Sequence, residues 1–313
     1  MNYVSISDLN EYIIKNLHVF PRDIDLIVGI PRSGMLPANL LALYLNKPYT
    51  DIDSFIDGRV YSTGERGRFI DNTTRKKILV VDDSIGSGNA LRKAKTKLKV
   101  FGNSFNMKYA AIIATEESAK LVDYYCEIIP FPRVFQWNLF HHLDFVPYAC
   151  FDIDGVLCED PPIDDDGPKY LNYIKHAIPK YIPTVEIHTL VTCRLEKYRK
   201  VTESWLNENN VKYKKLVMLN MSSREERLAW GKHGKYKGEV FAESDAAYFV
   251  ESSLKQARQI VKISKKPVFC TESFCMIEYK DEASCVDYFL FRVLRKLRFW
   301  KSSLIKRYSK CRN

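Results

Sequence analysis

Short apolar runs of β-strand type alternate with segments of helical length through most of this 313-residue chain. Strands that are apolar along their whole length are typical of parallel sheets with helices on both faces. The pattern therefore predicts an α/β protein built on parallel sheets. The predicted strands are residues 26–30, 77–83, 108–115, 148–155, 185–192, 213–219, 247–252 and 267–270. The clearest predicted helices are residues 35–45, 89–100, 196–207, 223–230 and 254–264.

Two motifs of the phosphate-binding kind, at residues 82–88 and 152–155, assign these strands to two separate sheets. We therefore expect two α/β domains, residues 1–143 and 144–283, followed by a segment of different character at 284–313. No apolar run approaches the roughly 20 residues of a membrane-spanning helix. The N-terminus is too polar for a signal peptide, and eight cysteines form no CxxC pair. These features favour a cytoplasmic protein with reduced thiols.

The net charge of +10 is unevenly distributed, because residues 290–313 contain nine basic residues and no acidic one. The rest of the chain carries only +1, which excludes a uniformly basic nucleic-acid-binding surface. From residue 286 onward, apolar residues recur at helical spacing with the cations between them, which predicts a basic amphipathic helix over 284–313. Such a helix can lie on an anionic membrane, pack on a partner protein or bind nucleic acid. Its aromatic stripe favours the membrane.

The first motif, residues 78–91, is an apolar strand, two carboxylates and a loop of small residues that enters a helix. Backbone N–H groups of such a loop can bind phosphate, and Gly86 and Gly88 permit a tight turn. Asp82 and Asp83 follow the strand and can accept hydrogen bonds from vicinal sugar hydroxyls. The alternative is a helix cap followed by a glycine-rich turn.

This segment resembles the signature of type I phosphoribosyltransferases, and residues 27–35 look like that family's pyrophosphate loop. The resemblance implies binding of phosphoribosyl pyrophosphate (PRPP) with Mg²⁺. Arg32 would face the pyrophosphate, in a loop shaped by Ser33 and Gly34, and Asp82 and Asp83 would bind the ribose hydroxyls. The implied 5-phosphate site comprises Ser84, Ile85, Gly86, Ser87, Gly88 and Asn89.

The stretch 58–68 is polar, glycine-rich and basic, and it occupies the place where the family has a loop that closes over the reaction. Arg59, Arg66 and Arg68 can supply charge there, or the stretch is a solvated hairpin.

The chain departs from the family in the acceptor pocket, because no base-binding hood is recognisable. The best match for acceptor contact is residues 133–138, where Trp137 either faces the acceptor or packs between domains. A hydroxyl acceptor needs a base, for which His141 and His142 are the nearest choices.

The second motif, Asp-Ile-Asp-Gly at residues 152–155, follows an apolar run. Two carboxylates this close can share the work of phosphoryl transfer. Asp152 can attack phosphorus while Asp154 transfers the proton of the leaving group, with Mg²⁺ between them. An EF-hand loop also uses this pattern, but the aliphatic lead-in and the missing glutamate at loop position 12 oppose calcium.

The motif closely resembles the opening motif of haloacid dehalogenase-like (HAD) phosphatases. The resemblance implies that Thr192 binds the transferred phosphoryl group and that Lys237 bridges nucleophile and phosphate, with Lys232 and Lys235 as competitors. Asp152, Asp154 and Glu251 would hold Mg²⁺. Ser252 and Ser253 stand where many relatives have another aspartate. This difference leaves three alternatives: the site binds the metal more weakly, Glu243 or Asp245 supplies a further metal ligand, or the domain is inactive. About 36 residues separate Leu157 from Arg194, which leaves room for a small cap or none.

Together, the two resemblances predict a bifunctional enzyme. It would transfer 5-phosphoribosyl from PRPP to a glycan, most simply a lipid-linked saccharide, and then remove the 5-phosphate to leave a β-ribofuranosyl residue in a surface polysaccharide. We expect it on the cytoplasmic membrane face, with no nucleic-acid partner. A nucleobase phosphoribosyltransferase with a nucleotidase domain, and a PRPP-sensing scaffold without turnover, are the alternatives. The sequence leaves the acceptor, the linkage and the oligomeric state open.

Overall fold

The computed structural model describes residues 2–61, 77–162 and 166–279, and the chain divides into two compact units between His142 and Leu143. This division falls next to the expected boundary after residue 143. The expected helix at 284–313 lies outside the described residues, as does most of the stretch 58–68 with Arg66 and Arg68. Within the described ranges, every helix is too short or too polar to cross a bilayer.

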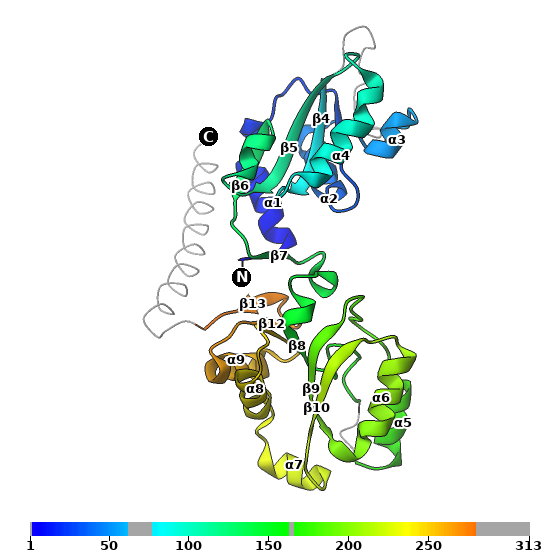
Figure 1. Ribbon diagram of the computed structural model, residues 1–313, viewed down its shortest axis with the longest axis vertical. Helices are drawn as coiled ribbons and strands as arrows, with labels where there is room; N and C mark the ends of the chain where they lie inside the picture. The colour runs from blue at the N-terminus through cyan, green and yellow to red at the C-terminus, as the bar shows by residue number, and fades with distance from the viewer. Residues whose placement is uncertain (1, 62–76, 163–165, 280–313) are drawn as a thin grey trace, which may run out of the picture. The chain divides into compact units, whose positions relative to one another are not determined.

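The first unit contains a five-stranded, wholly parallel sheet in the order β3-β2-β4-β5-β6, which confirms the predicted α/β fold class (Figure 1). A separate parallel pair, β1 and β7, brings the start of the chain beside residues 133–135. The strands are β1 (Asn2–Val4), β2 (Leu26–Gly29), β3 (Tyr49–Asp51), β4 (Lys77–Ser84), β5 (Asn106–Ala114), β6 (Tyr124–Ile128) and β7 (Arg133–Phe135). The α-helices are α1 (Ile6–Lys15), α2 (Met35–Leu45), α3 (Ile52–Ile56) and α4 (Asn89–Leu98).

Alternate residues of β4 serve two cores, one on each face of the sheet. Leu79 and Val81 pack with α1 and α2, whereas Ile78 and Val80 pack with α3 and α4. All four side chains are almost completely buried. This double burial is why β4 is apolar without alternation, and why its sequence predicted a central strand.

The second unit contains a six-stranded sheet in the order β10-β9-β8-β11-β12-β13, parallel except for β13. Helices α8 and α9 cover one face, and α5 and α6 cover the other (Figure 1). The strands are β8 (Ala149–Phe151), β9 (Ile187–Leu195), β10 (Tyr213–Leu219), β11 (Tyr248–Glu251), β12 (Val268–Cys270) and β13 (Cys275–Ile277). The helices are α5 (Pro168–His176), α6 (Arg199–Glu208), α7 (Arg224–Trp230), α8 (His233–Glu243) and α9 (Leu254–Ser264).

The structure adds strands and helices that the sequence pattern did not predict. Strands β3 and β6 are edge strands that are only partly buried, so they carry no continuous apolar run. Helix α8 escaped prediction because Gly234 and Gly238 lower its helix propensity. Strand β8 ends at Phe151, earlier than predicted, so Asp152 and Asp154 lie in the turn that follows it.

Candidate functional site

The two predicted motifs of the first unit meet at the carboxyl edge of its sheet, because β2 and β4 are neighbouring parallel strands. The loop after β2 lies directly against the end of β4. A Cβ atom at Gly34 would come within 2.5 Å of the Ile30 carbonyl oxygen and 2.8 Å of that of Val81. Glycine is therefore required at position 34 for this close approach. Arg32 is exposed beside it, and the Pro31–Arg32 peptide bond is cis.

Asp83 is the best-held carboxylate of this edge, and it is only 4% exposed. One of its oxygens accepts a hydrogen bond from Ser33 Oγ (3.0 Å), and the other accepts from Trp137 Nε1 (2.8 Å). Trp137 in turn stacks on Phe135 with 4.8 Å between ring centroids. Asp83 thus joins the loop after β2 to the strand β4. Trp137 therefore orients Asp83 within the first unit. The sequence had suggested two other roles for Trp137, which were contact with the acceptor and packing between domains.

Asp82, the neighbouring carboxylate, is partly buried. Burial, together with the negative charge and the hydrogen bond of Asp83, raises the pKa of Asp82 to about 8. One Asp82 oxygen accepts the backbone N–H of Asp83 (3.0 Å). Two adjacent carboxylates that cannot both ionise easily are an arrangement suited to binding hydroxyls or a cation.

The small-residue loop after β4 is fixed from outside. The carbonyl oxygen of Ile85 accepts from Ser118 Oγ (2.9 Å) and from Arg133 Nη2 (2.8 Å). Gly88 has φ +72°, which turns the chain into α4 at Asn89. The loop therefore lies at a helix N-terminus, as a phosphate site requires. Arg92, in the first turn of α4, donates to the Ser87 carbonyl oxygen (3.0 Å) and was not singled out from the sequence.

Acceptor contact at residues 133–138 stays a prediction, but the structure gives the Arg133 side chain another role. Arg133 is 4% exposed and donates to backbone carbonyls, so its charge serves the loop rather than an acceptor. The exposed aromatic beside the loop is instead Phe131, whose Cζ lies 2.8 Å from where a Cβ at Gly86 would stand. Roles for His141 and His142 stay predictions.

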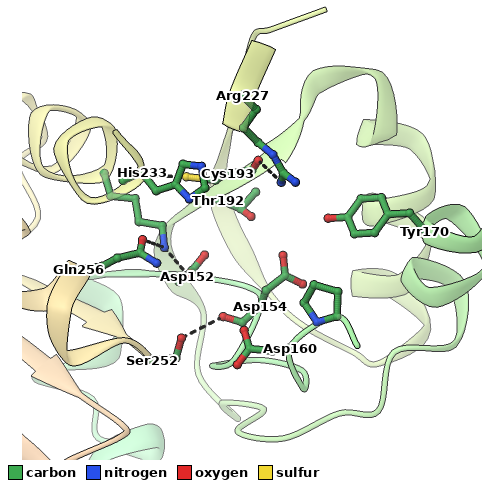
Figure 2. A pocket seen from close by; sticks show the side chains of 12 residues that line it. Asp152, Asp154, Asp160, Tyr170, Thr192, Cys193, Arg227, His233, Ser252 and Gln256 are labelled. Carbon is green, nitrogen blue, oxygen red and sulfur yellow. Dashed lines mark hydrogen bonds and ion pairs between the residues drawn. The ribbon is translucent and has the colours of Figure 1, made fainter. Parts of the chain in front are cut away.

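The second unit brings its predicted residues together at the carboxyl ends of three adjacent strands, β9, β8 and β11. Asp152 follows β8, Thr192 lies near the end of β9, and Glu251 ends β11. Asp152 and Thr192 line a cavity of about 170 Å³ (Figure 2). Its lining residues are Asp152, Asp154, Asp160, Pro161, Tyr170, Thr192, Cys193, Arg227, His233, Lys237, Ser252 and Gln256.

Lys237, on α8, is the cation that the structure places between the carboxylates. Its Nζ lies 2.6 Å from Asp152 Oδ2, 2.7 Å from Glu251 Oε2 and 3.0 Å from Gln256 Oε1. Of its two competitors, Lys235 pairs with Glu239 on the surface and Lys232 is exposed. Burial and the Glu251 charge raise the pKa of Asp152 to about 7, although Lys237 opposes them.

Asp154 is held by a cation to which the sequence analysis assigned no role. The guanidinium of Arg194, which is fully buried, donates to both Asp154 oxygens from Nε, and Nη2 lies 2.7 Å from Oδ1. Burial alone would raise the pKa of Asp154, but the Arg194 charge and hydrogen bonds lower it. Asp154 is therefore an anion here, and it can release a proton only after binding one.

Both carboxylate oxygens of Glu251, one of the predicted metal ligands, already accept hydrogen bonds from the protein. One oxygen accepts from Lys237, and the other accepts the backbone N–H of Ser253 (3.0 Å). Ser252 Oγ donates to the backbone carbonyl of Asp154 at 3.4 Å. The suggestion that Asp245 supports the metal is wrong, because Asp245 precedes β11 and pairs with His188 Nε2 (2.9 Å) near the opposite end of the sheet.

The carboxylate and carbonyl oxygens of the two sites could bind a Mg²⁺ ion that keeps several water or phosphate ligands, rather than one bound entirely by protein side chains. Among the described residues, no three His, Cys, Asp or Glu side chains are grouped to hold a metal ion. Mg²⁺ in phosphoryl-transfer sites needs only one or two carboxylates, since phosphate oxygens and water complete its shell. The Asp152 carboxylate and the Asp154 carbonyl could supply that, as could Asp82 and Asp83 in the first unit.

Two residues of the second cavity carried no recognisable sequence signal. Arg227 of α7 and Tyr170 of α5 are 8% and 3% exposed, and both line the cavity. In Figure 2 their polar ends point into the space above Asp154. Neither belongs to a motif, and each reaches the cavity only because its helix packs beside β9.

Residues 5–142 match the model of the phosphoribosyl transferase domain family, so the first unit is a phosphoribosyltransferase domain. No curated protein matches the chain. Among solved structures, the chain is similar to a Helicobacter pylori xanthine-guanine-hypoxanthine phosphoribosyltransferase (17% identity, TM-score 0.32, 44% of this chain and 92% of that one). It is also similar to a purine phosphoribosyltransferase from Pyrococcus horikoshii (20% identity, TM-score 0.32, 44% of this chain and 92% of that one). An orotate phosphoribosyltransferase from Aeropyrum pernix is a third such structure (16% identity, TM-score 0.28, 39% of this chain and 68% of that one).

Proposed function

We propose that the chain is a bifunctional enzyme that transfers 5-phosphoribosyl from PRPP to a glycan acceptor and then removes the 5-phosphate. The observation that carries this proposal is the buried Asp152–Lys237–Glu251 group beside Thr192, in the same chain as a phosphoribosyltransferase domain. A phosphatase following a transferase makes the transfer hard to reverse, because the product no longer carries the phosphate that the first site binds.

In the first step, the ribose acquires oxocarbenium character as pyrophosphate departs. The acceptor hydroxyl bonds to its anomeric carbon and loses its proton to a base, for which the sequence offers His141 or His142. Arg32 and the loop amides before α2 would stabilise the departing pyrophosphate. Asp83, positioned by Ser33 and Trp137, would accept from the ribose hydroxyls, and the loop at the start of α4 would hold the 5-phosphate. Mg²⁺, when bound beside Asp82 and Asp83, would offset the charge of pyrophosphate.

In the second step, an Asp152 oxygen forms a bond to phosphorus and the bond from phosphorus to the ribose oxygen breaks. The ribose oxygen takes up a proton from Asp154, which must first bind one from solvent as the Arg194 contact loosens and which regains one from the water that attacks next. Water then attacks phosphorus, releasing inorganic phosphate and restoring Asp152. Lys237 and Thr192 would hold the phosphoryl oxygens during both transfers.

The glycan acceptor and the membrane location rest on the sequence. A basic amphipathic segment at 284–313 suits an enzyme whose acceptor is attached to lipid at the cytoplasmic membrane face. Deleting this segment should release the protein from anionic vesicles while both activities on soluble substrates survive. Membrane binding that persists after the deletion would refute the tail's role.

The central experiment incubates the full chain with PRPP, Mg²⁺ and either a lipid-linked saccharide or free nucleobases. Ribose on the saccharide, with release of pyrophosphate and then phosphate, is the expected result. Consumption of a free base would instead favour a nucleobase phosphoribosyltransferase with a nucleotidase unit. Tight PRPP binding without pyrophosphate release would favour a PRPP sensor.

Two variants separate the steps. Asp152→Asn should accumulate a phosphoribosylated acceptor, because it lacks only the proposed nucleophile. Asp83→Asn should stop pyrophosphate release while leaving hydrolysis of a supplied phosphoribosyl product intact. If Asp152→Asn also abolishes pyrophosphate release, the proposed order of reactions is wrong.

A further inference from the structure

A second cation besides Lys237 lines the cavity of the second unit. Arg227, on α7, is 8% exposed, and its Nη1 donates to the Cys193 carbonyl oxygen (3.3 Å). Cys193 directly follows Thr192, so this contact fixes the guanidinium beside the proposed phosphoryl-binding hydroxyl. Figure 2 shows the guanidinium between Thr192 and Tyr170.

Two more basic groups of this region, Lys237 and Arg194, lie against carboxylates. Lys237 contacts both Asp152 and Glu251, and Arg194 holds Asp154 through both its oxygens. A phosphate monoester brings two further negative charges into the cavity at neutral pH. Arginine presents a planar fork of N–H donors that matches phosphate oxygens, and Arg227 presents it where those charges would lie.

Tyr170 faces this guanidinium from α5. In Figure 2 its hydroxyl points into the cavity toward Arg227, and its ring packs edge-on against Tyr198 with 5.2 Å between centroids. The ring is 3% exposed, so it closes the wall of the cavity beside Arg227. Arg227 is thus held by the end of β9, and the buried Tyr170 ring of α5 lines the cavity beside it.

The size of the cavity limits what can enter it. Its volume of about 170 Å³ is smaller than the roughly 300–1,000 Å³ of pockets that enclose whole small-molecule ligands. A phosphate group and the atoms next to it fill such a space, and the rest of the ester stays outside.

We propose that Arg227 binds a non-transferred oxygen of the substrate phosphate and, with Tyr170, restricts the second unit to terminal phosphate monoesters. This assignment rests on the proposed phosphatase function and deepens it, since a terminal phosphate is what a newly transferred 5-phosphoribosyl group presents. Arg227 is a binding residue supplied by α7, in addition to Lys237 and Thr192.

The test measures hydrolysis of ribose 5-phosphate by the full chain with Mg²⁺, and its inhibition by inorganic phosphate. Arg227→Gln should raise both KM and the inhibition constant of phosphate by about 10- to 100-fold, the range expected for loss of a hydrogen bond to a charged group. Arg227→Lys should recover part of this loss, because lysine restores the charge without the fork. Tyr170→Phe should raise KM less, since it removes one hydroxyl from the cavity wall and leaves the guanidinium in place.

Arg199→Gln is the matched control, because it removes the same group from α6, where Arg199 pairs with Glu196 and Glu203. It should leave KM and phosphate inhibition unchanged. The shift in melting temperature on adding inorganic phosphate gives a readout without turnover, and we expect it to shrink in Arg227→Gln but not in Arg199→Gln.

The outcomes separate this inference from the function on which it rests. If the wild type hydrolyses ribose 5-phosphate and Arg227→Gln keeps the same KM and phosphate inhibition, the role of Arg227 is wrong and the phosphatase function stands. If no ester is hydrolysed but phosphate stabilises the wild type and not Arg227→Gln, the phosphatase function is wrong and Arg227 remains the phosphate ligand. A loss of kcat alone in both Arg227 variants would also overturn the binding role.

Discussion

Replacing Lys237 by methionine tests the centre of the second site. In the native structure the Lys237 side chain is 3% exposed, and the two carboxylates that it contacts are 6% and 0% exposed. Methionine keeps much of the volume of the lysine side chain but removes the charge. It leaves Asp152 and Glu251 buried beside each other without a cation.

Breaking a buried ion pair by removing one partner typically costs about 3–5 kcal/mol, because the remaining charge stays desolvated. In a unit of this size, each kcal/mol corresponds to roughly 2–4 °C in melting temperature. We therefore expect Lys237→Met to lower the melting temperature of the second unit by about 6–20 °C at pH 8, measured by calorimetry. Lys235→Met is the control, since its pair with Glu239 is half exposed and is worth about 0.3–0.5 kcal/mol.

The pH dependence gives a second criterion. Burial already raises the pKa of Asp152 to about 7, and loss of the Lys237 charge should raise it further. A carboxyl whose folded pKa lies above its unfolded value stabilises the fold less as pH rises, because the folded state binds the proton more tightly. The penalty of Lys237→Met should thus shrink as pH falls from 8 to 5. Equal losses for Lys237→Met and Lys235→Met, or a penalty independent of pH, would refute this reasoning.

Three further predictions concern the first unit. Because burial and the Asp83 charge raise the pKa of Asp82 to about 8 in the folded state, its contribution to stability falls as pH rises from about 4 to 8. Asp82→Asn should therefore gain stability relative to the wild type between pH 5 and pH 9 in denaturant titrations. An unchanged difference between pH 5 and pH 9 would contradict this. Trp137→Phe keeps the stacking on Phe135 but loses the hydrogen bond to Asp83, so KM for PRPP should rise roughly 10- to 100-fold; an unaltered KM would show that Trp137 does not position Asp83. Gly34→Ala would place a methyl group 2.5 Å from the Ile30 carbonyl oxygen, so we expect it to abolish the rise in melting temperature on adding PRPP, and retention of that rise would mean that the loop can move away from β4.

Local sequence was enough to predict the α/β fold class and the place of each motif at a strand end. Strand β4 shows why, because residues buried on both faces must be apolar in succession, and the two aspartates near its carboxyl end follow that apolar run. The same reasoning failed for edge strands, whose exposed faces tolerate polar residues.

Which side chains contact each other was decided by tertiary packing. Lys237 lies 85 residues from Asp152 along the chain, and it reaches that carboxylate because α8 packs closely on α9. Gly234 and Gly238 make this approach possible, since a Cβ at either position would come within 2.3 or 3.0 Å of an α9 side chain. In the sequence these glycines only weakened the helix prediction.

The two motifs and the buried parallel strands that precede them could be predicted from the sequence, because hydrophobic periodicity and turn chemistry are local properties. Only the tertiary structure decided that Arg194 neutralises Asp154, that Trp137 holds Asp83 and that Arg227 enters the second cavity. Each of these contacts joins residues distant in the chain. A charged or aromatic side chain in a sequence does not specify its partner, which depends on how closely the helices and strands that carry the two residues pack.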